Sequence, residues 1–169
     1  SLLQENIKKF DLGSFDFIEK SKTRDMYIAG SSQSEPILID RSSSSIPWKS
    51  GDNDDLQYLR ESEITQAAWV GDTLVALASL KGGVIFVQPF KGRITKIVNA
   101  SSGLPDNEVI SLSVDRNNAV WVAHEYGLTR ISPYMPYRTY DQFPGIEGNI
   151  LSVKRHLGDM YVCTTEALF

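Results

Sequence analysis

Few side chains in this sequence have the types and spacing that acid–base or metal chemistry requires. The chain contains two histidines, His124 and His156, and one cysteine, Cys163. The histidines stand in separate segments, without the short spacing that metal ligands show. No Gly-x-Ser-x-Gly elbow, phosphate loop or dinucleotide fingerprint occurs in the sequence. We therefore predict no catalytic residue, no metal site and no cofactor.

The stretch GDNDD at 51–55 is the nearest approach to a cation site. Its alternating oxygen-bearing side chains are typical of calcium loops. It lacks the central glycine and the terminal bidentate glutamate that an EF-hand loop requires. We therefore predict a solvated loop at these residues.

Composition excludes two other classes of function. The net charge is -4, with 41% hydrophobic and 22% charged residues. Such a balance is ordinary for a globular protein, and a nucleic-acid-binding protein would need a basic patch. No apolar stretch approaches the length of a membrane span. We expect one domain over 1–169, no nucleic-acid partner and no membrane insertion within this segment.

The elements that must position any functional residue follow a repeat. A polar turn residue followed by an apolar run recurs about 41 to 47 residues apart, a period typical of propeller blades. These segments are DMYIAG at 25–30, DTLVAL at 72–77, NAVWVA at 118–123 and DMYVCT at 159–164. An apolar strand precedes each turn, and a third strand begins at PILID, GVIFVQ, GLTRIS and, in the last copy, EALF.

A fourth, outer strand is predicted at 56–59 (LQYL), 94–98 (ITKIV) and 137–140 (YRTY). Four antiparallel strands in such a period form one blade of a β-propeller. The first outer strand has an alternative, because Leu56, Leu59 and Glu63 also fit a short helix whose first turn would hold the aspartates. We prefer the strand, which matches the register of the other copies.

The predicted fold is therefore all-β, a β-propeller fragment of about four blades of four antiparallel strands. The blades cover approximately 13–60, 61–99, 106–141, and 148–169 plus 6–11. The last blade is either split between the termini or open. An unpaired blade would expose a long strand edge, so we expect IKKF at 7–10 to supply its outer strand. That closure could occur within one chain or between two chains, and an open arc of a longer propeller is the alternative.

The stretch GLPDNEVISLSVDRNNAVWVAHEYGLTRI at 103–131 resembles the two-component regulator propeller repeat. The matching residues are Gly103, Leu104, Pro105, Asp115, Trp121, Val122, Gly127 and Leu128. The stretch GIEGNILSVKRHLGDMYVCTTEALF at 145–169 is similar to a second copy, with Ala167 where glycine is usual. The first two copies keep the turn and strand pattern without the Gly-Leu-Pro lead-in.

The resemblance implies a ligand-sensing segment of a bacterial two-component-type regulator, outside the cytoplasm and part of a membrane-anchored protein. It implies an oligosaccharide-like ligand and no catalysis by this segment. Two alternatives remain open: a propeller enzyme similar to streptogramin lyases, with a histidine and a metal, and a cell-surface assembly or interaction propeller. The partners expected are a carbohydrate or other small ligand, and either a second copy of the chain or the remainder of a longer propeller.

Strand direction predicts where a ligand would bind. In an antiparallel blade, the link that enters the first strand and the loop between the second and third strands lie at the same end. These segments are rich in hydrogen-bonding groups, and Tyr126 adds a stacking surface. Trp121 is expected to pack between blades instead. The candidate ligand-binding residues are Asp106, Asn107, His124, Glu125, Tyr126, Glu147, Asn149 and Thr165.

Overall fold

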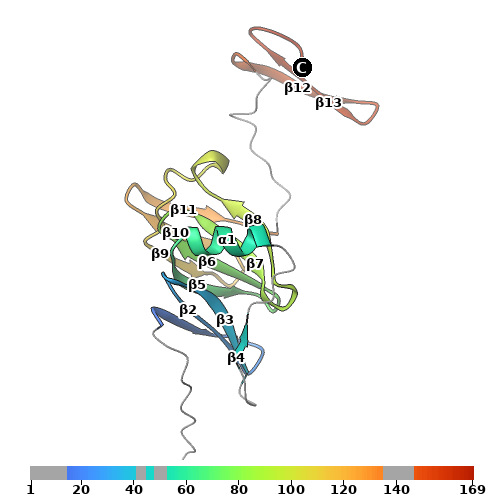
Figure 1. The fold of residues 1–169 in the computed structure, drawn as a ribbon. Coiled ribbons are helices and arrows are strands. Elements are labelled where there is room, and N and C mark those ends of the chain that lie inside the picture. The colour runs from blue at the N-terminus through green and yellow to red at the C-terminus, as the bar shows by residue number, and fades with distance from the viewer. Residues whose placement is uncertain (1–14, 41–44, 48–52, 135–146) are drawn as a thin grey trace, which may run out of the picture. The chain divides into compact units, whose positions relative to one another are not determined.

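The computed structural model describes residues 15–40, 45–47, 53–134 and 147–169 (Figure 1). The chain divides into two compact units, Ser1–Met135 and Pro136–Phe169. The described residues form antiparallel sheets, with one α-helix and two short 3-10 turns, η1 (Pro89–Lys91) and η2 (Ala100–Ser102). The prediction of an all-β fold is confirmed.

Two sheets of the first unit each contain four antiparallel strands in chain order. We call them blade 1 and blade 2, and their strands a to d in the order of the chain. Blade 1 consists of β1 (Phe17–Lys20), β2 (Met26–Ser31), β3 (Ser34–Asp40) and β4 (Ser45–Pro47). Blade 2 consists of β5 (Ile64–Val70), β6 (Leu74–Ser79), β7 (Val84–Gln88) and β8 (Arg93–Val98).

Blade 3 is the third sheet of the first unit and has three described strands, with β10 between its two neighbours. They are β9 (Ser111–Val114), β10 (Val120–His124) and β11 (Gly127–Ile131). Its predicted outer strand at 137–140 lies outside the described residues. The strand IKKF at 7–10, on which the predicted ring closure depends, lies outside them too.

The second unit contains the hairpin of β12 (Ile150–His156) and β13 (Asp159–Thr164), which we call blade 4. The last residues of the chain return along β13. The amide of Phe169 donates to the Val162 carbonyl at 2.9 Å, and the Val162 amide donates back to the Phe169 carbonyl at 2.9 Å. An isolated β-bridge between Cys163 and Leu168 lies at the place where EALF predicts a third strand.

Blade 2 is buried on both faces because its side chains alternate between two apolar clusters. Val75 and Leu77 of β6 pack in the cluster shared with blade 1, around Trp69. Ala76 and Ala78 of the same strand pack in the cluster shared with blade 3. Side chains of successive strand residues point to opposite faces, so a strand between two blades must be apolar throughout. This packing explains why VALA in β6 shows no alternation with polar residues.

One predicted strand is wrong. LQYL at 56–59 lies in helix α1 (Asn53–Glu61), and the outer strand of blade 1 is β4 instead. Leu59 is buried in the cluster between blades 1 and 2, with Leu56 and Tyr58 packed against it. The helical spacing prevails because this apolar stripe covers the cluster, whereas a fourth strand is already present in β4.

The predicted solvated loop at 51–55 is also wrong where it can be checked, because Asn53–Asp55 form the first turn of α1. Acidic side chains there interact favourably with the positive end of the helix dipole. One Asp55 oxygen also accepts a hydrogen bond from the Ile94 amide at 2.7 Å, which ties the helix to the start of β8.

Candidate functional site

Two kinds of connection lie at one end of the first unit: the links that lead into the a strands, called entering links, and the loops between strands b and c, called b–c loops. Hydrogen bonds hold them together. The amide of Val109, in the link before β9, donates to the Ser79 carbonyl at 2.9 Å. The Gly83 amide donates to the Asn107 carbonyl at 2.9 Å, and the Ile110 amide to the Ala123 carbonyl at 2.9 Å. The predicted common end is therefore confirmed for these segments, and we call it the loop end.

Every b strand ends in a buried polar residue at the start of its b–c loop. In blade 2, the Ser79 hydroxyl donates to the Gly83 carbonyl at 2.7 Å and accepts from the Gly82 amide at 3.0 Å. Hydroxyls close the corresponding loops of blades 1 and 4 in a similar way, through the pair Ser31–Ser34 and through Thr164. The four positions are Ser31, Ser79, His124 and Thr164.

Blade 3 departs from this pattern because its residue is His124. The residue is 7% exposed, and its Nε2 lies 2.9 Å from the Thr129 hydroxyl. Its Nδ1 is buried without a hydrogen-bond partner in the described structure. In one neutral tautomer of this ring Nδ1 donates a hydrogen bond, and in the other it accepts one. A buried polar atom without a partner costs about 1–3 kcal/mol, so this position favours a group that would satisfy it.

The rest of the blade 3 loop is exposed. Glu125 and Tyr126 follow the histidine, and Tyr126 is 69% exposed. Gly127 starts β11 with φ at 131°, a conformation that favours glycine. The loop therefore presents a carboxylate and an aromatic ring to solvent immediately beside a buried histidine.

The link before β9 supplies the neighbouring candidates, which differ in their availability. The Asn107 side chain accepts from the Ala100 amide at 2.8 Å and its carbonyl accepts from Gly83, so this residue holds the link in place. Asp106 is half-buried, and its carboxylate accepts from the Asn107 amide at 2.6 Å. Glu108 is exposed beside it. The link therefore places two carboxylates, those of Asp106 and Glu108, at the loop end.

The remaining three candidates belong to the second unit. The Asn149 amide donates to the Thr165 hydroxyl at 3.0 Å, and the Thr165 amide donates to the Asn149 carbonyl at 2.9 Å. Glu147 is exposed two residues before Asn149. Asn149 and Thr165 therefore close the entering link onto the b–c loop of blade 4, and whether any of the eight candidates binds a ligand stays a prediction.

Two features escaped the sequence analysis. The first is the series of buried polar residues, although each one is the polar residue that ends an apolar run. The second is Gln66, whose side chain bonds the backbone of the next blade. Its amide nitrogen donates to the Leu112 carbonyl at 3.1 Å, and its amide oxygen accepts from the Leu112 amide at 2.9 Å. Gln66 thus joins the a strands of blades 2 and 3 at the loop end.

Trp121 does not occupy the site. It lies on the face of β10 opposite to Val120 and Val122, a face that the first unit leaves uncovered, so its packing between blades stays a prediction. Its indole nitrogen donates to the Asp115 carboxylate at 3.2 Å, and the Arg130 guanidinium lies 5.9 Å from the ring centroid. These contacts lie on the face of blade 3 opposite to the cluster shared with blade 2.

Other kinds of site are not supported by the described part of the chain. No three His, Cys, Asp or Glu side chains gather there in an arrangement that could hold a metal ion. Its helices are all too short or too polar to cross a bilayer. What the site offers is hydrogen bonding and aromatic contact.

The fold defines the class of protein as a β-propeller. No family model and no curated protein matches the sequence. Solved structures share the fold at low identity: the extracellular domain of BT3049, described as a hybrid two component system of B. thetaiotaomicron, has a TM-score of 0.56 at 14% identity. The extracellular domain of BT4673, described as a one component system of the same organism, has a TM-score of 0.53 at 16% identity.

A third similar structure is YCF48 bound to D1 peptide, with a TM-score of 0.54 at 16% identity. Each match covers 89% of this chain. The chain spans 19% of the BT3049 domain, 21% of the BT4673 domain and 47% of YCF48. The likeness at this level of identity is one of fold.

Proposed function

We propose that this chain is part of an extracytoplasmic ligand-sensing propeller of a bacterial two-component-type regulator, and that it binds an oligosaccharide-like ligand without catalysis. The observation that carries the proposal is the departure of blade 3 at the loop end. Blades 1, 2 and 4 close the b–c loop on a buried hydroxyl, whereas blade 3 has His124 with an unpartnered Nδ1 beside exposed Glu125 and Tyr126.

The chemistry of the loop supports a hydroxyl-rich, neutral ligand. A sugar hydroxyl both donates and accepts, so it can bond to a carboxylate and to either tautomer of a histidine. The carboxylates of Asp106, Glu108 and Glu125 would repel an anionic ligand. The exposed ring of Tyr126 provides an apolar face of the kind that packs against a pyranose ring. His124 Nδ1 would take part once the loop moves enough to admit a ligand hydroxyl.

Two further observations support sensing over catalysis. The loop end groups no set of titratable side chains with a nucleophile and an oriented base within the described residues. Two of the structures with the same fold are extracellular domains of a hybrid two component system and a one component system. The match spans only 19% and 21% of those two domains, so we expect the complete sensor to contain further blades.

Calorimetry with neutral oligosaccharides on the extracytoplasmic region that contains this chain tests the proposal. We expect Glu125→Ala to weaken binding about tenfold or more, because a hydrogen bond to a charged group contributes about 1.5–3 kcal/mol. Tyr126→Ala should weaken it through loss of the apolar contact. His124→Ser, which installs the residue type of blades 1 and 2, should keep the fold and weaken binding.

Arg116→Ala and Asn117→Ala are matched controls, since both residues are exposed in the turn between β9 and β10 at the opposite end. These controls should bind as tightly as the wild type. Equal affinity in the Glu125, Tyr126 and control variants would contradict the assignment of the loop. Hydrolysis or elimination of the oligosaccharide by the chain would contradict the sensor function.

A further inference from the structure

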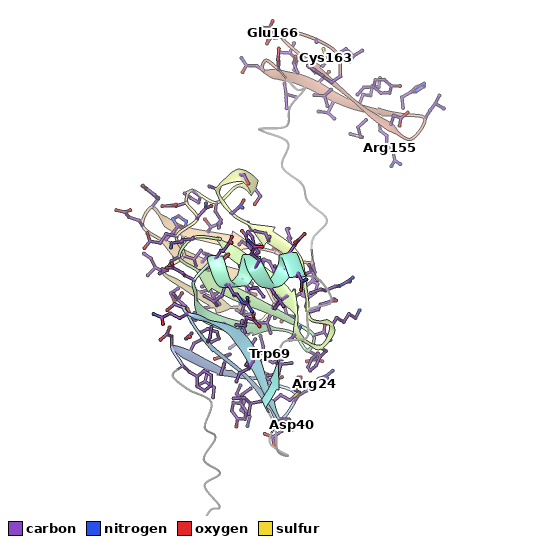
Figure 2. All side chains as sticks on the ribbon, in the orientation of Figure 1. Arg24, Asp40, Trp69, Arg155, Cys163 and Glu166 are labelled. Atoms are coloured by element: carbon purple, nitrogen blue, oxygen red, sulfur yellow. The ribbon has the colours of Figure 1, made fainter. Side chains whose placement is uncertain are left out.

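A second surface lies at the end opposite to the loops, where blades 1 and 2 meet. It is formed by the turn between β1 and β2 and by the turn between β7 and β8, which contains η1. The two turns contact each other, because the Arg24 guanidinium lies 4.5 Å from the ring centroid of Phe90. Figure 2 shows Arg24 and Trp69 together at this end of the first unit. We call this surface the basic turn surface.

The basic turn surface concentrates cations in an acidic protein. The stretches 20–25 and 89–93 hold five of the chain's 17 lysines and arginines, although they are far apart in the sequence. These residues are Lys20, Lys22, Arg24, Lys91 and Arg93, and all of them are exposed. The chain as a whole carries a net charge of -4. The fold therefore gathers exposed cations that the sequence does not display as a run.

Carboxylates are present at the same end and neutralise part of this charge. Asp25 pairs with Lys20 at 3.8 Å, and Asp40, which has a partner of its own, stands opposite Met26 in the sheet. Glu19 is partly buried, and this burial raises its pKa while the charge of Lys22 opposes the shift. Asp55 lies at the margin, where it accepts from the Ile94 amide. The exposed cations of the two turns that a partner could contact include Lys22, Arg24 and Lys91.

An exposed aromatic ring lies among these cations. Phe90 is 43% exposed, and its ring centroid is 6.1 Å from that of buried Trp69. The indole of Trp69 also donates to the Glu19 carbonyl at 3.4 Å. Phe90 is thus supported from below by the core, and Arg24 lies over its ring. Arginine and aromatic side chains on a rigid base are the residues most enriched at the energetic centres of protein interfaces.

We propose that the basic turn surface binds an acidic segment of a partner protein, with Phe90 and Arg24 as the central contacts and Lys22 and Lys91 at the rim. An acidic peptide would pair its carboxylates with the cations and place an apolar side chain against the exposed part of Phe90. This proposal does not rest on the proposed function, because it concerns the opposite end of the blades.

A polypeptide fits this surface better than the other polyanions do. An anionic membrane surface attracts clusters of lysine and arginine, and here the carboxylates of Asp25 and Asp40 stand among the cations and weaken that attraction. A polysaccharide would need an open aromatic face for stacking, and Arg24 covers that of Phe90. Discrete cations separated by carboxylates suit a partner that presents its own charges at discrete positions.

The test uses a fluorescein-labelled nonapeptide of three Glu-Asp-Phe repeats and its neutral counterpart of three Gln-Asn-Phe repeats. We expect the 169-residue chain to raise the fluorescence anisotropy of the acidic peptide only, and binding to weaken as salt is added. Combined Lys22→Glu, Arg24→Glu and Lys91→Glu substitutions should weaken it at least tenfold. Phe90→Ala should weaken it while leaving the salt dependence unchanged, which separates the aromatic contact from the charges.

Combined Arg60→Glu, Lys81→Glu and Arg116→Glu substitutions are the matched control, since they reverse three exposed cations elsewhere in the first unit. Circular dichroism verifies that both triple variants fold. If the two triple variants weaken binding equally, the effect is one of net charge and the proposal is wrong. The proposal is also wrong if polygalacturonate displaces the peptide from the wild type and if Phe90→Ala weakens polygalacturonate binding as much as it weakens peptide binding.

Discussion

Blades 2 and 3 share the order of their strands and differ in what surrounds them. Blade 2 is packed on both faces, and its b–c loop is closed internally by Ser79. Blade 3 buries one face against blade 2, and its b–c loop contains His124 with an unpartnered nitrogen. The comparison indicates that the middle blade carries most of the packing of the described unit, whereas its neighbour leaves polar groups exposed at the loop end.

The largest effect should come from a matched pair of tryptophans. Trp69 in blade 2 is 2% exposed, whereas Trp121 in blade 3 is 42% exposed. We expect Trp69→Ala to lower the free energy of unfolding by about 3–5 kcal/mol, through lost burial and the cavity that remains. Trp121→Ala should cost about 1 kcal/mol, from its contacts with Asp115 and Arg130.

Urea denaturation of the two tryptophan variants, followed by circular dichroism, provides the measurement. Equal losses would show that Trp121 is as well packed as Trp69 in solution. That result would contradict the view that blade 2 alone has two buried faces within the described unit.

A glycine pair at equivalent loop positions should give the next largest effect. Gly83 immediately precedes β7 and Gly127 begins β11, both with positive φ, at 78° and 131°. A Cβ on Gly83 would lie 2.3 Å from the Val98 carbonyl oxygen, whereas a Cβ on Gly127 would meet nothing within 4 Å. Both alanine variants incur backbone strain, and Gly83→Ala should lose about 1–3 kcal/mol more because a backbone atom must move.

Thermal melting of the Gly83→Ala and Gly127→Ala variants measures this difference. The Gly127 variant also sharpens the comparison of the two loops, since it alters the b–c loop of blade 3 without a clash against the core. If Gly127→Ala melts as low as Gly83→Ala, the blade 3 loop is as tightly packed as that of blade 2, and its availability to a ligand is contradicted.

The smallest effect is a pH dependence located in the a–b turn of blade 3. The pKa of Asp115 is held below its ordinary value, first by the Ala119 amide that donates to it at 3.0 Å. The Trp121 indole, the Asn117 amide and the Arg130 guanidinium act in the same direction. Because the folded pKa is below the unfolded one, the stabilisation is present above the unfolded pKa and is lost as pH falls through the folded pKa.

We therefore expect Asp115→Asn to melt below the wild type at neutral pH and to approach it in acid. Glu19 in blade 1 should behave in the opposite sense, because burial raises its pKa. Its contribution is present below the unfolded pKa and is lost as pH rises through the folded pKa. Glu19→Gln should accordingly melt above the wild type at neutral pH and close to the wild type in acid. Melting curves of both variants from neutral to acidic pH provide the measurement. If the two variants shift the melting temperature in the same direction at neutral pH, these assignments are wrong.

Much of the fold could be predicted from local pattern. The polar residues that precede each apolar run mark the turns between strands a and b. One of these turns is built by Asp115, whose carboxylate accepts from the Asn117 amide at 2.8 Å, with Asn118 at a φ of 60°. Strand direction alone also predicts that the entering links and the b–c loops lie at the same end of the blades. These features depend on residues close together in the chain, so the sequence contains their causes.

The candidate site was only partly predictable. Polar loops at one end follow from strand order, but the sequence does not reveal that Asn107 is held by Gly83 and Ala100 while Glu125 and Tyr126 are exposed. It also does not show that Gln66 bonds the backbone of the next blade. Both facts depend on contacts between blades, which no local pattern contains.

The sequence by itself determined the order of strands and turns in this protein, because runs of apolar residues, glycines and polar turn residues act on the backbone locally. Only the tertiary structure decided between helix and strand at 53–61, since the deciding factor is the apolar cluster that Leu59 covers. It likewise brought 20–25 beside 89–93 and left His124 with a buried unpartnered nitrogen. Packing between distant segments sets burial and the local sum of charge, and these two quantities determine which side chains can meet a partner.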